Sequence, residues 1–235
     1  MPEFDCSREV ILPAAPETVW DAVATNEGNA GWLFPNDVDP GAANAYEPPA
    51  HLHIHQEQGE SFNDLNFVIE DRGDGTTALR YAHTGTFPPE NFEAQNDQIQ
   101  QHTDFYLHTL GEYVAHFSGR PVTYIGEVPG GIQGPESSVT PDGFARLKAA
   151  LGLTDGVSEG DEVRLHPEGT EAIDGVIDYL RPNFMGIRTA DALYCFFGRN
   201  AFGQPVAMSI HSFADGVDAE QAKRGWQRAL ADSLS

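Results

Sequence analysis

Apolar and polar residues alternate along several short segments in the first half of the chain. Alternation with a period of two is typical of a half-buried β-strand, because successive side chains point to opposite faces. The segment Asp71-Arg-Gly-Asp-Gly75 separates two of these stretches and has the composition of a hairpin turn. We expect antiparallel strands at residues 8–12, 51–56, 65–69 and 77–84.

Helical spacing interrupts this alternation at three places. Pro13 to Pro16 marks a turn into a helix that begins near Glu17, and residues 26–32 form a second, short helical piece that ends before Pro35. Residues 36–49 are rich in Pro, Asp and Ala and are expected to form a loop. From about Asn91 to Phe117 the apolar residues recur every three or four positions, so we expect one long amphipathic helix.

The second half of the chain repeats this order of elements. Residues 118–135 are dense in Gly and Pro around a short apolar stretch, 122–128, which is expected to be a strand. A helix should open at Thr140, and a terminal helix should carry Trp226 and Leu230 inward. Strands are expected between these helices, at residues 161–166, 172–180, 184–197 and 205–213. We therefore expect two domains, residues 1–120 and 121–235.

Composition and charge narrow the classes of function. Hydrophobic residues make up 40% of the 235 residues and charged residues 21%, as in ordinary globular proteins. The formal net charge is −23, so the protein should repel nucleic acids and anionic membranes. The start of the chain lacks the basic and apolar regions of a secretory signal, and no apolar run approaches the ~20 residues that span a bilayer. We expect a cytoplasmic protein in which Cys6 and Cys195 are small core residues.

Three segments resemble a known family. REVILPAAPETVWDAVATNEGNAGWLFP is similar to the opening of the activator of heat-shock-protein-90 ATPase homologues, in which a strand, a Pro-bounded turn and two helices lead to Trp-hydrophobic-Phe-Pro. LNFVIEDRGDGTTALRYAHTG resembles that family's last hairpin, and HTDFYLHTLGEYVAHFSGR its long helix. The second half resembles longer bacterial members of the family. Where many relatives carry Gly-Trp in the long helix, this chain has Thr103-Asp104-Phe105.

This resemblance to the START-like, or polyketide-cyclase (SRPBCC), superfamily implies an α+β helix-grip fold of the Bet v 1 type. In such a fold a long C-terminal helix lies across a curved antiparallel sheet, and here two such units would stand in tandem. The space between helix and sheet would bind a small hydrophobic molecule, either lipid-like or aromatic. The alternatives are a cyclase or hydratase that uses the same cavity, and a chaperone-interacting protein without a ligand. A homo-oligomer remains compatible with all three.

The cavity walls are expected where the inward faces of the strands meet the long helix. Trp32 and Phe34 would cap one end of the cavity, and Tyr81 and His83 would supply its polar tips. The alternative for each residue is that it simply fills a core. The complete set of candidate cavity-lining residues is Trp32, Phe34, Phe67, Leu79, Tyr81, His83, Tyr106, Leu110 and Tyr113.

Histidines are the main candidates for metal binding or catalysis. His51, His53 and His55 alternate with apolar residues, a spacing that could present ligands to zinc but also fits a strand with a polar outer face. His83 and His211 each end a strand, where Asp104 or Asp215 could approach them as in a general base. Because no nucleophile elbow, phosphate loop or paired-cysteine motif accompanies them, we predict no catalytic residue, no metal ion and no cofactor.

Overall fold

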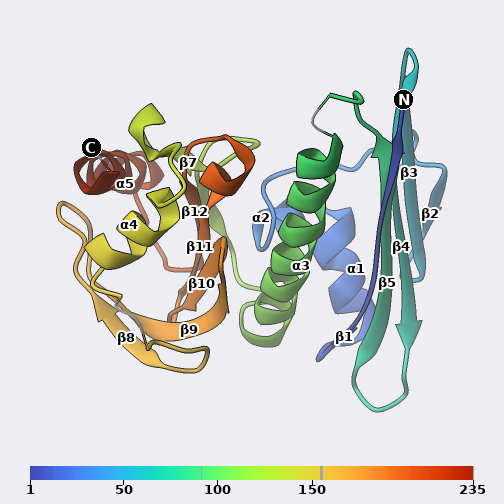
Figure 1. Ribbon diagram of the computed structural model, residues 1–235. Coiled ribbons are helices and arrows are strands. Elements are labelled where there is room, and N and C mark those ends of the chain that lie inside the picture. The colour runs from blue at the N-terminus through green and yellow to red at the C-terminus, as the bar shows by residue number, and fades with distance from the viewer. Residues whose placement is uncertain (91, 154–155, 235) are drawn as a thin grey trace. The chain divides into compact units, whose positions relative to one another are not determined.

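The structure is a computed structural model that describes residues 1–90, 92–153 and 156–234. The chain divides into two compact units, Met1–Gly119 and Arg120–Ser235. Each unit has its own antiparallel sheet and its own helices (Figure 1). The two units are therefore described separately.

The first unit is built on a five-stranded antiparallel sheet. The first strand along the chain pairs with the last, so the order across the sheet is β1-β5-β4-β3-β2. This arrangement lets the chain leave β1, form two helices, and return to build the sheet back toward β1. The strands are β1 (Glu3–Leu12), β2 (Ala45–Glu47), β3 (His51–Gln58), β4 (Ser61–Asp71) and β5 (Thr77–Thr86).

Three helices belong to this unit: α1 (Pro16–Ala24), α2 (Asn26–Ala30) and α3 (Phe92–His116). Pro16 occupies the first turn of α1, where a missing N–H is tolerated. Thr25 caps α2, because its hydroxyl oxygen accepts a hydrogen bond from the Gly28 backbone N–H at 2.9 Å. The 25-residue helix α3 lies across one face of the sheet, on the same side as α1 (Figure 1).

The pairing register separates the sheet into an inner face toward α3 and an outer, polar face. Leu52, Phe67, Tyr81 and Arg8 are successive partners across the sheet and so point to the same side. Arg8 identifies that side as the inner one, because its Nε donates to Asp104 Oδ1 of α3 at 2.5 Å. The side chains one position along each strand consequently face outward.

The second unit repeats the strand order of the first. Its sheet runs β6-β12-β11-β10-β9-β8, so that the opening strand again pairs with the last one. The short strand β7 also pairs with β12. The strands are β6 (Thr123–Ile125), β7 (Ile132–Gln133), β8 (Glu162–Leu165), β9 (Ile173–Arg181), β10 (Phe184–Arg188), β11 (Ala192–Phe197) and β12 (Ala207–Ser212). The α-helices are α4 (Gly143–Ala150) and α5 (Ala219–Leu234), and 3₁₀ turns occur at Glu136–Ser138 and Arg199–Phe202.

A single hydrophobic core joins this second sheet to its helices. Trp226, Leu230 and Leu234 of α5 are buried in it, as are Phe144 and Leu147 of α4. Both helices thus use residues three or four positions apart, the spacing that forms one apolar stripe.

The predicted α+β fold with antiparallel sheets and a long helix is confirmed, and several predicted boundaries are corrected. β1 begins at Glu3 rather than residue 8, and residues 184–197 form two strands of a hairpin rather than one. The expected loop at 36–49 contains β2, the expected strand 122–128 is reduced to β6, and β7 was not predicted. The predicted start of the long helix, Asn91, lies outside the described residues.

Candidate functional site

The first unit contains an inner cavity of about 240 Å³ between its sheet and α3. Most of the side chains around it are aliphatic or aromatic. Such a concave, apolar site with few polar groups is the usual form of a small-molecule site. The lining residues are Trp32, Leu33, Phe34, Leu65, Phe67, Tyr81, His83, Ile99, His102, Thr103, Tyr106 and Leu107.

Neighbouring strands and the spacing of α3 bring these side chains together. Leu65 pairs with His83 and Phe67 pairs with Tyr81, so that β4 and β5 present four side chains to the same hollow. The residues of α3 follow at intervals of three and four from Ile99 onward, which keeps them on one helix face.

Trp32 is held at one end of the cavity by α1. Its indole Nε1 donates a hydrogen bond to the carbonyl oxygen of Ala22 at 2.9 Å, and its exposed fraction is only 3%. Because the buried N–H is satisfied, the ring keeps its orientation without using a polar group of the cavity.

Two polar side chains at the sheet side of the cavity are uncharged at neutral pH. Burial lowers the pKa of His83 to about 4, against a smaller opposing effect of Asp64, and its Nε2 donates to Asn63 Oδ1 at 2.6 Å. Burial raises the pKa of the Tyr81 phenol well above its ordinary value, with a weaker opposing hydrogen bond to Thr103. The cavity therefore offers hydrogen bonds but no formal charge from these residues.

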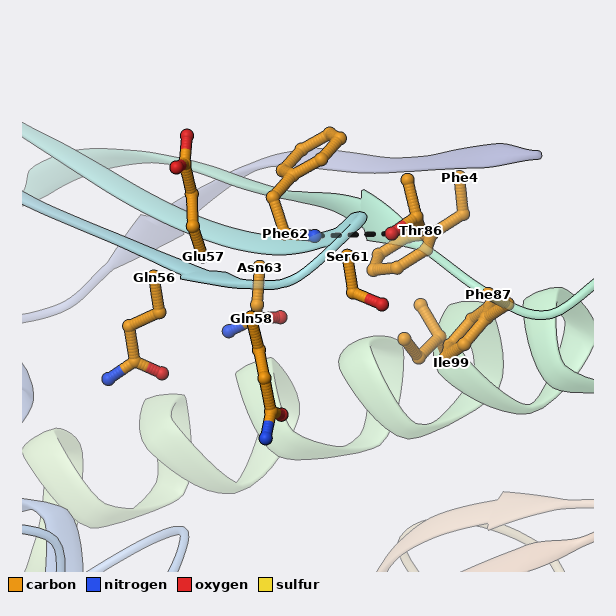
Figure 2. A pocket seen from close by; sticks show the side chains of 10 residues that line it. All are labelled: Phe4, Gln56, Glu57, Gln58, Ser61, Phe62, Asn63, Thr86, Phe87 and Ile99. Atoms are coloured by element: carbon orange, nitrogen blue, oxygen red, sulfur yellow. Dashed lines mark hydrogen bonds between the residues drawn. The ribbon is translucent and has the colours of Figure 1, made fainter. Parts of the chain in front are cut away.

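An outer hollow of about 670 Å³ adjoins this cavity at the tip of the β3–β4 hairpin. Ile99 lines both spaces, and the His83–Asn63 hydrogen bond joins a residue of each. Its lining is more polar than that of the inner cavity (Figure 2). The residues around it are Phe4, Gln56, Glu57, Gln58, Ser61, Phe62, Asn63, Thr86, Phe87 and Ile99.

Of the nine candidates from the sequence, the structure brings six together around the inner cavity: Trp32, Phe34, Phe67, Tyr81, His83 and Tyr106. Leu79, Leu110 and Tyr113 are instead packed in the core, with exposed fractions of 0%, 0% and 7%. Sequence reasoning did not select Ile99, Thr103 and Leu107. The helical spacing of these three with Tyr106 was the signal that could have found them.

The three histidines of β3 point to the outer face of the sheet and bind polar partners there. Asp64 Oδ2 accepts hydrogen bonds from His53 Nε2 and His55 Nδ1, both at 2.8 Å, and His51 contacts Asn66 at 2.9 Å. Burial raises the pKa of Asp64, but these hydrogen bonds outweigh it and the pKa is lowered overall. Among the described residues, no group of three or more His, Cys, Asp or Glu side chains is arranged to hold a metal ion.

His83 does not have Asp104 as the acid partner that the sequence suggested. Asp104 binds Arg8 rather than His83. His211 has an exposed fraction of 0%, and its ring lies 5.4 Å from that of Tyr124.

The second unit has a hollow of its own, of about 650 Å³, between its sheet and α5. Tyr194 and Trp226 form part of its apolar wall, while Glu171, Asp191, Asp215 and Asp218 surround it with carboxylates. Burial raises the pKa of Tyr194 to about 12, and the nearby Asp191 and Glu171 add to this effect. This hollow is accordingly a more polar and more acidic environment than the inner cavity of the first unit.

Comparison with known proteins gives matches only at the level of structure. No family model matches the chain, and no curated protein matches it. DynU16, from the dynemicin biosynthetic locus, aligns at 12% identity and a TM-score of 0.40, covering 99% of this chain and 96% of that one. The di-domain ARO/CYC BexL gives 12% identity and 0.40, with 98% and 93% covered.

The Aha1 dimer from Colwellia psychrerythraea is also similar, at 14% identity and a TM-score of 0.32, and it covers 47% of this chain and 95% of its own. Two of these neighbours, an ARO/CYC protein and an Aha1, carry names of the kinds of protein that the sequence resembles. At these identities and scores they carry no argument about function, which has to come from the cavities themselves. Among the described helices, none has the length and apolar composition of a membrane span.

Proposed function

We propose that the first unit binds a small, apolar molecule in the inner cavity between its sheet and α3. The observation that carries this proposal is the cavity itself: a space of about 240 Å³ walled by Trp32, Leu65, Phe67, Tyr106 and Leu107. Well-packed cores contain few voids larger than a water molecule, so a hollow of this size in an apolar setting favours a ligand.

The size of the cavity limits the ligand to a compact one. Small-molecule pockets usually measure about 300 to 1,000 Å³, and the inner cavity lies just below that range. An aromatic molecule of two rings or a short aliphatic chain suits it better than a large polycyclic one. The rings of Trp32, Phe34, Phe67, Tyr81 and Tyr106 around the cavity favour aromatic contacts of the edge or offset type.

Binding without catalysis fits the polar groups of the site better than an enzymatic role. His83 donates to Asn63 rather than to a carboxylate, and its pKa of about 4 makes it a weak base at neutral pH. A cyclase would need a stronger base or a charged group to stabilise developing charge. The site therefore supports retention of a ligand more strongly than its transformation.

A titration with a neutral, environment-sensitive apolar dye such as N-phenyl-1-naphthylamine tests the proposal. We expect saturable, one-to-one fluorescence enhancement in the wild-type protein. Native mass spectrometry of freshly purified protein should in parallel reveal added mass that organic extraction removes. Absence of both signals would contradict the proposed binding.

A pair of leucine substitutions distinguishes a cavity from a core. Leu65→Trp should fill the inner cavity and reduce dye affinity at least tenfold with little loss of stability, since Leu65 lines the hollow. Leu79→Trp should instead lower the free energy of unfolding by about 1 to 3 kcal/mol, because Leu79 is fully buried outside the cavity. Dye titration and urea unfolding of both variants give the comparison; equal loss of binding in the two would contradict the placement of the site.

A further inference from the structure

The polar residues around the outer hollow lie on both faces of the sheet. The register places Gln56 opposite Asn63 and Gln58 opposite Ser61, so these four share the inner face. Figure 2 shows their side chains directed toward α3, whereas Glu57 and Phe62 point away from it on the other side of the hairpin. The part of the hollow that meets the inner cavity is therefore lined by amides and hydroxyls, and the carboxylate of Glu57 is outside it.

Several of these polar groups are available to a ligand. Within the described residues, the side chains of Gln56, Gln58 and Ser61 make no hydrogen bond with another protein group, while Asn63 Oδ1 accepts from His83 at 2.6 Å. Phe4 and Phe87 stack beside them, with ring centroids 4.7 Å apart. Amide and hydroxyl groups next to aromatic rings offer both hydrogen bonds and apolar contact to one polar head group.

Positive charge is scarce throughout this unit. The first 119 residues contain 20 Asp or Glu and 3 Arg, without Lys, which gives a formal net charge of −17; the remaining chain has 16 acidic and 10 basic residues, or −6. Arg8 binds Asp104 and Gln100, and Arg80 binds Glu70. None of the described residues that line either space is Lys or Arg.

We propose that the ligand of the first unit is an uncharged amphiphile, whose apolar part occupies the inner cavity and whose hydroxyl- or amide-bearing head is bound by Gln56, Gln58, Ser61 and Asn63 in the outer hollow. This rests on the proposed binding of an apolar molecule by the inner cavity. An anionic head would find no cation and would be repelled by the field of the unit. A cationic head would find amides instead of a carboxylate on the inner side of the hairpin.

Three ligands with the same eight-carbon chain separate these cases: octyl glucoside, octanoate and octylammonium. They are titrated below their micelle concentrations into the full-length protein by calorimetry, in 0.5 M NaCl, where the Debye length is below ~8 Å and the long-range field is suppressed. We expect octyl glucoside to bind at least tenfold more tightly than either charged ligand. Equal or tighter binding of octanoate or octylammonium would overturn the proposal.

Two substitutions on neighbouring positions locate the head group. Gln58→Glu keeps the side-chain length and places a carboxylate on the inner side of the hairpin. It should therefore lower the affinity for octyl glucoside severalfold and raise the affinity for octylammonium. Glu57→Gln removes a charge on the opposite face and should leave the order of the three ligands unchanged. Unchanged affinities for octyl glucoside and octylammonium in Gln58→Glu, or a reversed ligand order in Glu57→Gln, would show that the head lies elsewhere.

Failure of this inference differs from failure of the proposed function. If the neutral dye binds and Leu65→Trp abolishes its binding, the inner cavity holds apolar ligands regardless of the head-group result. If the three octyl compounds then bind alike, only the assignment of the outer hollow is wrong. If neither dye nor octyl glucoside binds, both proposals fail together.

Discussion

His83 connects the two spaces of the first unit through a single hydrogen bond. Its ring lies 5.0 Å from that of Phe4 in an edge-on arrangement, and its Nε2–H is used by Asn63. A neutral imidazole satisfies this geometry, whereas a second proton on the ring would add charge to a mainly apolar setting. The residue is therefore a partly buried hydrogen-bond donor whose protonation opposes folding.

The pH dependence of stability should report this effect. Because the folded-state pKa of His83 is lowered from 6.5 to about 4, its contribution to stability is fully present above pH 6.5 and is lost as the pH falls toward 4. In that window wild-type protein should lose about 1 kcal/mol per pH unit more than His83→Gln. Urea unfolding of both proteins at pH 7, 6 and 5 measures the difference.

The comparison of wild type with His83→Gln also removes the contribution that the histidines on the outer face of the sheet make to the pH dependence of stability. Hydrogen bonds to Asp64 and then Glu57 raise the pKa of His55, so its contribution has the opposite sign and is present in both proteins. Parallel stability curves for wild type and His83→Gln would contradict a His83 that stays neutral in the folded protein.

Residue alternation predicted which way side chains point but not where along the strand the space lies. Tyr81 and His83 line the inner cavity, while Leu79, two positions earlier on the same face, does not. The hydroxyl of Thr77 donates to the Ala14 carbonyl at 2.7 Å, which brings the start of α1 to that end of β5. A period of two carries no information about such a neighbour, and for this reason Leu79 could not be separated from Tyr81 by sequence.

At the level of elements, the close packing of α2 on α1 fixes one end of the inner cavity. A Cβ added at Gly28 would lie 1.9 Å from the Asp21 carbonyl oxygen and 2.7 Å from the Ala22 Cα. Ala22 is also the residue whose carbonyl receives the Trp32 indole N–H. The absence of a side chain at Gly28 thus sets the distance between the two helices and the place of Trp32.

Substitution of this glycine should affect both stability and binding. The added methyl group of Gly28→Ala would push α2 away from the backbone of α1. We therefore expect a loss of about 1 to 3 kcal/mol in the free energy of unfolding together with weaker dye binding. Gly111→Ala is the matched control, because the added Cβ would lie 3.8 Å from Leu12 Cδ2, an ordinary contact distance. Its free energy of unfolding should rise by about 0.5 to 1 kcal/mol, since alanine favours the helical conformation of α3 over glycine. Thermal unfolding and dye titration test both; a neutral Gly28→Ala would show that α2 shifts freely.

Long elements were predictable from sequence and short ones were not. The 25 residues of α3 give several turns of apolar spacing, whereas the three residues of β2 and the two of β7 are too few to show any period. These short strands exist because a neighbouring strand offers them backbone partners: Ala45 pairs with His53, and Ile132 with Met208. Such pairing depends on tertiary contacts that local sequence does not contain.

At the scale of the whole molecule, two units share a strand order but differ in charge. Each sheet pairs its opening strand with its last one, yet the first unit carries −17 of the net charge and the second only −6. The shared order follows from a repeated pattern of elements that the sequence shows directly. The net charge of a unit does not determine the character of its hollow, because the inner cavity of the more acidic first unit is lined by no carboxylate of the described residues, whereas Glu171, Asp191, Asp215 and Asp218 surround the hollow of the second.

The net charge should also determine which large partners the protein rejects. A charge of −23 without a clustered basic run opposes binding to polyanions, since no counterion release would offset the repulsion. We expect no retention on heparin at 150 mM NaCl and no sedimentation with vesicles that contain phosphatidylserine, while a basic protein of similar size is retained in both assays. Lowering the salt to ~10 mM extends the Debye length to ~30 Å and should strengthen this exclusion rather than relieve it. Retention that grows as salt is lowered would instead reveal a local basic site that outweighs the field of the whole chain.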